Sequence, residues 1–178
     1  MRRIEGSAGV KLIECTHPAK NRWHIRWDVQ ENEDGSATYM EEEFNHRPTE
    51  DEIKKTVVDW INAQTDEAIL SGFEWNGMRV WLSGENQFNY KAAHDLAHQM
   101  PEAALPVKFK FGTDDEPCYH TFQTVEELTD FYVQSIKYIQ GKLDIGWDKK
   151  DAFSLDSYRV WNNPSGVGNK KAPSRLLI

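Results

Sequence analysis

The stretch that decides the fold covers residues 72–90 and reads GFEWNGMRVWLSGENQFNY. Gly72 predicts the end of a preceding helix, because a residue in the left-handed region is least costly without a Cβ. Asn76-Gly77 predicts a two-residue turn, since both of its central residues require a positive φ. Ser83 predicts the N-cap of a new helix, because its hydroxyl can accept from the free N–H groups. A helix, a tight hairpin and a second helix therefore follow one another here.

Five aromatic side chains lie within this stretch, which we call the aromatic hub (residues 72–90). Trp75 and Trp81 stand on either side of the turn, an even number of positions apart, so an unbulged ribbon would direct both to one face. We expect both to be core or interface residues. Phe88 and Tyr90, at the start of the second helix, complete the predicted interaction site of the hub.

The composition limits the class of protein. The chain has 178 residues, seven Trp and a formal net charge of -8, with a pI of about 5.3. This length fits one domain, or one domain with a small appendage, and the negative charge disfavours binding to a nucleic-acid backbone. No apolar run approaches the length of a membrane span, and residues 1–9 lack the apolar core of a signal peptide. We therefore expect a soluble, cytoplasmic chain with reduced cysteines that binds neither nucleic acid nor membrane.

The N-terminal part predicts an antiparallel hairpin. Residues 1–10 are expected to form a flexible arm, and residues 11–15 a short strand. Residues 22–29 alternate without exception between apolar and polar side chains, which is typical of a half-buried strand. A turn at 32–35 and a return strand at 37–44 place Met40 opposite Val29. Residues 11–47 are therefore expected to form an N-terminal hairpin region.

Three acidic residues occupy the return strand of this hairpin, Glu41, Glu42 and Glu43. They could form an acidic binding ridge. We favour instead charges on an edge strand that deter aggregation, because the alternation directs Glu42 inward.

Helix signals follow in the rest of the chain. Thr49 with Glu52, and Thr124 with Glu127, have the spacing of a capping box, and an apolar stripe follows each pair. The first helix is predicted to end before Gly72, and the helix that begins at 125 is predicted to end at Gly141. On the middle helix, residues 84–100, helical geometry predicts a buried side made of Phe88, Ala92, Leu96 and Met100.

These elements define the fold class. Residues 107–111 and 118–122 predict a third hairpin, separated by an acidic turn. We therefore predict an α+β fold with a short N-terminal antiparallel sheet, two further hairpins and three packed helices, within a single domain at residues 11–153.

The C-terminal residues 154–178 differ from this domain. They are rich in Gly and Asn, and from residue 156 onward four cationic residues stand against one acid, giving a net charge of +3. Two interpretations remain open: a loose terminus, or a basic tail that binds an acidic neighbouring surface. Its candidate contact residues are Trp161, Lys170, Lys171 and Arg175.

Residues 60–150 contain motifs that resemble a known family. The motifs are Gly-Phe-x-Trp-x-Gly, Leu-Ser-x-Glu-Asn-Gln, a Leu-Pro strand and Glu-Leu-x-x-Phe-Tyr. The residues that carry them are Phe73, Trp75, Asn76, Gly77, Leu82, Glu85, Asn86, Gln87, Leu105, Pro106, Glu127, Leu128, Phe131 and Tyr132. This order resembles an uncharacterised domain of tail-fibre and baseplate-region proteins of phages and prophages. The resemblance implies a phage protein, made in the host cytoplasm and associated with the virion, and it implies no catalytic residue.

Two groups of residues have the spacing of metal ligands. His94 and His98 lie at i and i+4 on the middle helix, but helical geometry directs them toward water, on the side opposite Phe88. Two Cys-x-His pairs, Cys15 with His17 and Cys118 with His120, would form a tetrahedral site if their strands were neighbours. Buried cysteines also behave as small apolar residues, so we expect no metal and no cofactor.

These observations favour a non-enzymatic phage or prophage structural or tail-associated protein. It would bind other proteins, among them virion or tail subunits and further copies of itself. Two alternatives remain open. One is a small metal-dependent hydrolase that uses the histidine or Cys-x-His groups, and the other is an acidic protein that mimics nucleic acid to inhibit a host protein.

Overall fold

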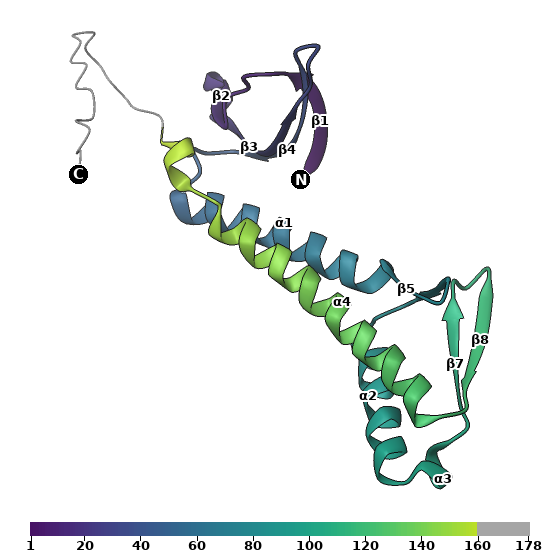
Figure 1. Cartoon of the computed structure of the whole chain (residues 1–178). Helices are drawn as coiled ribbons and strands as arrows, with labels where there is room; N and C mark the ends of the chain where they lie inside the picture. The colour runs from purple at the N-terminus through teal and green to yellow at the C-terminus, as the bar shows by residue number, and fades with distance from the viewer. Residues whose placement is uncertain (160–178) are drawn as a thin grey trace, which may run out of the picture. The chain divides into compact units, whose positions relative to one another are not determined.

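The computed structural model describes residues 1–159, which form two compact units (Figure 1). The first unit comprises Met1–Pro48 together with residues 155–159, and the second comprises Thr49–Ser154. The α+β class is confirmed, since one four-stranded antiparallel sheet and two hairpins combine with the helices. The predicted single domain at residues 11–153 differs from this division, because the N-terminal sheet pairs only its own strands.

The first unit is a sheet of four antiparallel strands in the order β1-β4-β3-β2. The strands are β1 (Arg2–Ser7), β2 (Ile13–His17), β3 (Arg22–Glu31) and β4 (Ser36–Phe44), and a short 3-10 turn (Pro18–Lys20) joins β2 to β3. The predicted flexible arm at residues 1–10 is wrong, because β1 pairs along β4 from Arg2 opposite Glu41 to Ser7 opposite Ser36. Arg2 and Arg3 each contact a carboxylate from another strand. These distant partners stabilise a strand that has no local apolar pattern.

The register of the β3–β4 hairpin differs from the prediction by two residues. Met40 lies opposite Trp27, where the sequence predicted Val29. One residue of the shift comes from the turn, where Gly35 adopts a φ of 83° in a three-residue loop. The other comes from a bulge after Trp27, where Asp28 adopts a φ of 50°. Because side chains alternate with a period of two, the combined shift leaves Trp23, Ile25 and Trp27 on their predicted face. Beyond the bulge the alternation is reversed, and Gln30, where the sequence predicted Val29, shares the face of Trp27.

The start of the predicted C-terminal tail belongs to the first unit. Leu155–Tyr158 form a 3-10 turn, and the Tyr158 side chain is buried. Its hydroxyl donates to the backbone carbonyl of Arg26 on β3 at 2.8 Å. The remaining predicted tail residues, Trp161, Lys170, Lys171 and Arg175, lie outside the described residues.

The second unit contains the long helices. It consists of α1 (Glu50–Ser71), β5 (Phe73–Trp75), β6 (Met78–Val80), α2 (Gly84–Gln99), the one-turn α3 (Pro101–Ala104), β7 (Val107–Gly112), β8 (Pro117–Phe122) and α4 (Val125–Asp151). The N-cap predictions are confirmed, because Thr49, Ser83 and Thr124 each accept from a backbone N–H in the first turn of their helix. The full capping box forms at Thr49 and Glu52.

Helix α4 continues ten residues past its predicted end at Gly141, to Asp151. Gly141 is exposed, and a Cβ there would meet nothing within 4 Å. Gly146 is buried against α1, where a Cβ would lie 2.5 Å from Thr65 Oγ1. The two helices run side by side (Figure 1). The second glycine therefore permits a close approach of two helices, whereas the sequence suggested a helix end.

Gly72 ends α1 as predicted, but for a different physical reason. Its φ is -102°, outside the left-handed region that a Schellman-type end requires. A Cβ at this position would lie 2.2 Å from the hydroxyl of Tyr138 on α4. That hydroxyl donates to the Ala68 carbonyl at 2.6 Å, in the last turn of α1. Glycine is needed here because the Tyr138 side chain occupies the space.

The core of the second unit is largely aromatic. Trp75, Phe111, Phe122 and Phe131 are almost fully buried, and their ring centroids lie between 5.2 and 6.4 Å apart in the contacting pairs. Offset and edge-on contacts at such distances add to the hydrophobic contribution of the rings. This core holds the hairpins against α2 and α4, and so determines which side of each element faces outward.

Candidate functional site

The aromatic hub has one buried and one exposed Trp. The turn at Asn76 and Gly77 is confirmed by positive φ values of 50° and 74°. Trp75 is 2% exposed and pairs with Met78, whereas Trp81 is 47% exposed. The prediction that both lie on one face is wrong. Across a two-residue turn, residues i and i+3 share a face, so the parity of the alternation changes at the turn.

The buried indole of Trp75 also has a polar contact. Its N–H donates to Asp130 Oδ2 at 3.1 Å, and a second bond to the same oxygen comes from Gln134. These two hydrogen bonds lower the pKa of Asp130. Trp75 is therefore a structural residue of the core and not a contact residue for a partner.

The side of helix α2 that was predicted to be buried is exposed, and another side of the helix faces the core. Tyr90 and Ala97 are buried, with the Tyr90 ring 5.0 Å from Phe131. Phe88 is 70% exposed, and Leu96 and Met100 are also exposed. We call the exposed side the α2 outer row; it consists of Phe88, Ala92, Leu96 and Met100.

The reason for this error is the presence of two stripes on one helix. Phe88 and Leu96 form an apolar stripe, while Tyr90, Ala93 and Ala97 form a second one roughly 130° further round the helix. The flat Tyr90 ring and the small alanines fit closely against α4, with Ala97 fully buried. The buried side of α2 is therefore determined by how closely its side chains pack against α4, and not by hydrophobicity alone.

The two histidines of α2 are packed against α4. The His94 ring stacks on Tyr132 with centroids 4.5 Å apart, and its side chain is only 17% exposed. His98 Nε2 lies 3.0 Å from Thr129 Oγ1. The prediction that this side of the helix faces water is wrong for His94. The same contacts that bury Ala97 place the histidines at the edge of the helix interface.

The two Cys-x-His pairs lie in different units. Cys15 and His17 belong to β2 of the first unit, while Cys118 and His120 belong to β8 of the second. His120 Nε2 lies 2.8 Å from Glu127 Oε1, so this imidazole already has a partner. Within residues 1–159, no three His, Cys, Asp or Glu side chains gather into a group that could hold a metal ion.

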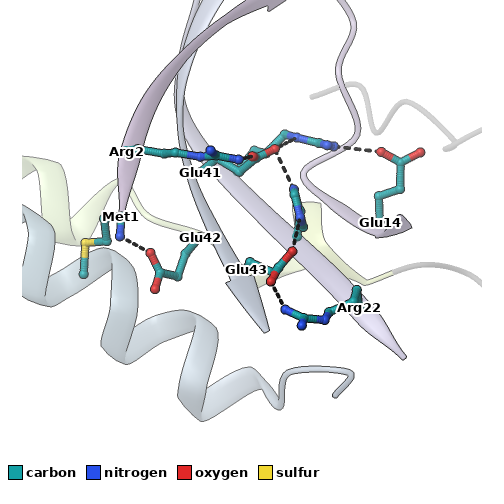
Figure 2. A network of polar contacts seen from close by, with 9 residues as sticks. Met1, Arg2, Glu14, Arg22, Glu41, Glu42 and Glu43 are labelled. Atoms are coloured by element: carbon teal, nitrogen blue, oxygen red, sulfur yellow. Dashed lines mark hydrogen bonds and ion pairs between the residues drawn. The ribbon is translucent and has the colours of Figure 1, made fainter. Parts of the chain in front are cut away.

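The acidic residues of β4 form a network of polar contacts with three cationic side chains of β1 and β3 (Figure 2). Glu41 and Arg26 are both buried, and Arg26 Nε lies 2.8 Å from Glu41 Oε2. Arg26 also reaches Glu14 on β2 at 2.9 Å. Burial by itself raises the pKa of Glu41, but the hydrogen bonds from His24 and Arg26 outweigh it and lower the pKa.

The other two acids of β4 also have cationic partners. Glu42 pairs with the N-terminal ammonium of Met1, and Glu43 pairs with Arg22 and contacts His24 (Figure 2). The prediction of edge-strand charges is wrong, because β4 is an inner strand between β1 and β3. The network instead joins the strands, and its carboxylates are already neutralised by neighbours.

Comparisons with known proteins give no independent indication of function: no family model, curated protein or solved structure matches the chain. No helix in the described part of the chain is long and apolar enough to cross a membrane. The α2 outer row and the exposed Trp81 are the features of the predicted interaction site that a partner can reach.

Proposed function

We propose that the chain is a non-enzymatic protein-interaction module that binds another protein subunit through the α2 outer row. The exposure of this row carries the proposal: Phe88 and Leu96, on one side of α2, are 70% and 44% exposed, and Met100, the C-cap residue of the helix, is 57% exposed. Contiguous exposed apolar side chains commonly mark interaction sites. A helix that presents anchors at spacings of four residues suits a groove or a second helix.

The alternatives receive less support from the same geometry. A metal-dependent hydrolase would need the His94 imidazole free to bind an ion, but the ring is stacked on Tyr132 and largely buried. An acidic inhibitor that mimics nucleic acid would need a row of uncompensated carboxylates. Glu41, Glu42 and Glu43 each have a cationic partner instead.

The class of partner follows from the resemblance to phage and prophage tail-fibre and baseplate-region proteins. We propose that the module belongs to such an assembly, is made in the host cytoplasm and joins the virion. Several residues that carry the resemblance, such as Phe73, Trp75 and Leu82, lie in the core. They support the fold and leave the α2 outer row available for a partner. Another copy of this chain is the first partner to test.

Sedimentation equilibrium of the full chain over micromolar to millimolar concentrations tests this proposal. We expect the wild-type chain to self-associate, and Phe88→Ser with Leu96→Ser to weaken association at least tenfold. Burying one large apolar side chain is worth about 1.5–3 kcal/mol, and a tenfold change corresponds to about 1.4 kcal/mol. Ile145→Ser is the matched control, because Ile145 is 52% exposed on another helix.

Two results would contradict the proposal. A wild-type chain that remains monomeric over the whole range would refute self-association. Equal association by the control and by the double variant would show that the α2 outer row is not the contact surface. The melting temperature of each variant checks that the fold is intact.

A further inference from the structure

A cavity of about 410 Å³ lies beside the exposed hub residue Trp81. Its apolar lining comes from Trp81, which is 47% exposed, and from the buried Phe111 on β7. Its polar lining includes Arg79 on β6, Asn86 on α2 and Lys110 on β7. Pockets of this size that combine apolar walls with a few polar groups are typical of ligand sites.

The cavity has more cationic than acidic side chains, Arg79 and Lys110 against Asp114, in a chain that is acidic as a whole. The chain has a formal net charge of -8, yet both Arg79 and Lys110 line the same cavity. Arg79 is exposed, and although Glu74 lies opposite it in the β5–β6 hairpin, no ion pair joins the two side chains within residues 1–159. A guanidinium can bind a carboxylate through two parallel hydrogen bonds, which gives both affinity and orientation. The cavity therefore suits a ligand with a carboxylate and an apolar body.

Lys110 forms only a weak ion pair within the protein, with Asp114. Its ammonium lies 3.2 Å from Asp114 Oδ1, in the loop between β7 and β8. The Lys110 side chain is 50% exposed and the Asp114 side chain is fully exposed. Exposed pairs of this kind contribute little and are screened by salt. An incoming carboxylate can therefore replace Asp114.

The proposed binding of a protein partner favours a peptide over a saccharide as the ligand. β6 and β7 contact each other, and each pairs only within its own hairpin. The two strands lie too close together to admit a further strand between them, so the peptide reaches the cavity with a side chain and not by strand addition.

We propose that this cavity binds an acidic side chain, next to an apolar residue, from a segment of a partner protein. Arg79 and Lys110 hold the carboxylate, Trp81 contacts the apolar residue, and Asp114 competes with the ligand for Lys110. The inference rests on the proposed function in that the segment belongs to a protein partner, but the site is separate from the α2 outer row. Neither Arg79 nor Lys110 was singled out by the sequence, because strand-surface cations are common.

Proton–nitrogen correlation NMR of the full chain, titrated with acetyl-Leu-Glu-Phe-amide, tests the site. We expect the resonances of Arg79, Trp81 and Lys110 to shift with millimolar peptide. The glutamine version of the peptide should leave them in place, because it lacks the charge. Binding should also weaken at about 0.5 M salt, where the Debye length is only a few ångström.

Two variants with opposite expected effects on peptide binding make the test specific. Arg79→Gln should weaken binding about tenfold or more, since a hydrogen bond to a charged group contributes about 1.5–3 kcal/mol. Asp114→Asn should strengthen binding up to about fivefold, because it removes a competing exposed ion pair. Lys54→Gln, an exposed cation on α1, makes the same change of charge as Arg79→Gln and should have no effect.

Three outcomes would overturn the inference. They are no shift at saturating millimolar peptide, equal shifts with the glutamine peptide, and shifts with glucuronic acid but not with the peptide. The last would assign the cavity to an acidic saccharide. The variant Phe88→Ser with Leu96→Ser should keep peptide binding. A failure of peptide binding with self-association intact therefore refutes this inference and leaves the proposed function standing.

Discussion

Two glycines in α4 should respond in opposite ways to the same substitution. Gly141→Ala should stabilise the protein, because Gly141 is exposed with open space around it. Gly146→Ala should destabilise it, because the new Cβ would lie 2.5 Å from Thr65 Oγ1 and 3.2 Å from Thr65 Cγ2. The close approach of α4 to α1 at this point is the physical reason for the difference.

The expected magnitudes follow from two opposing effects. Alanine is favoured over glycine within a helix by about 0.8–1.0 kcal/mol, which sets the gain at Gly141. At Gly146 the same gain is offset by overpacking, which typically costs about 1–3 kcal/mol. The unfolding free energies of the two variants should therefore differ by about 1–3 kcal/mol. Thr65→Ala removes both atoms nearest to the new Cβ and should restore most of the loss.

Urea unfolding followed by far-UV circular dichroism measures these differences. The decisive quantity is the coupling between Gly146→Ala and Thr65→Ala in a double-mutant cycle, expected at about 0.5–3 kcal/mol. Gly141→Ala with Thr65→Ala is the matched control and should show no coupling. If both alanine variants stabilise the protein equally, the α1–α4 contact at Gly146 is wrong, and so is the reasoning about the end of α4.

Three further predictions concern other parts of the molecule. Trp75→Ala should cost about 3–5 kcal/mol of unfolding free energy in urea titrations, and Trp81→Ala clearly less, because Trp81 is 47% exposed; equal losses would contradict the hub geometry. Burial raises the pKa of Tyr158 from 10.0 to about 12, so the unfolded chain ionises first and stability should fall as pH rises through this interval. The fall should be smaller for Tyr158→Phe, and identical pH profiles would count against the buried hydroxyl. Glu41→Gln should lower the unfolding free energy by about 3 kcal/mol, the low end of the cost of breaking a buried ion pair. The cost stays at the low end because Arg26 keeps its second carboxylate partner, Glu14 on β2. An unchanged melting temperature would exclude a structural role for the network.

Local sequence determined the elements whose signals lie within a few residues. Thr49 and Ser83 cap their helices because the hydroxyl meets N–H groups two or three residues ahead. Asn76 and Gly77 form their turn because both residues tolerate positive φ. The alternation of β3 placed Trp23, Ile25 and Trp27 on the correct face, but it did not predict the bulge at Asp28 that reverses the alternation beyond them. The α+β class followed from these elements.

The tertiary structure alone decided which surfaces are exposed, and therefore where a candidate site lies. Helix α2 has two usable stripes, and only the fit of Tyr90 and Ala97 against α4 chose between them. β1 forms because it pairs along β4, from Arg2 opposite Glu41 to Ser7 opposite Ser36, with residues far along the chain. The glycine at 146 could mark a helix end or a close contact, and Thr65 on α1 determines which. These choices depend on pairs of residues distant in sequence, whose packing and ion pairs no local pattern contains.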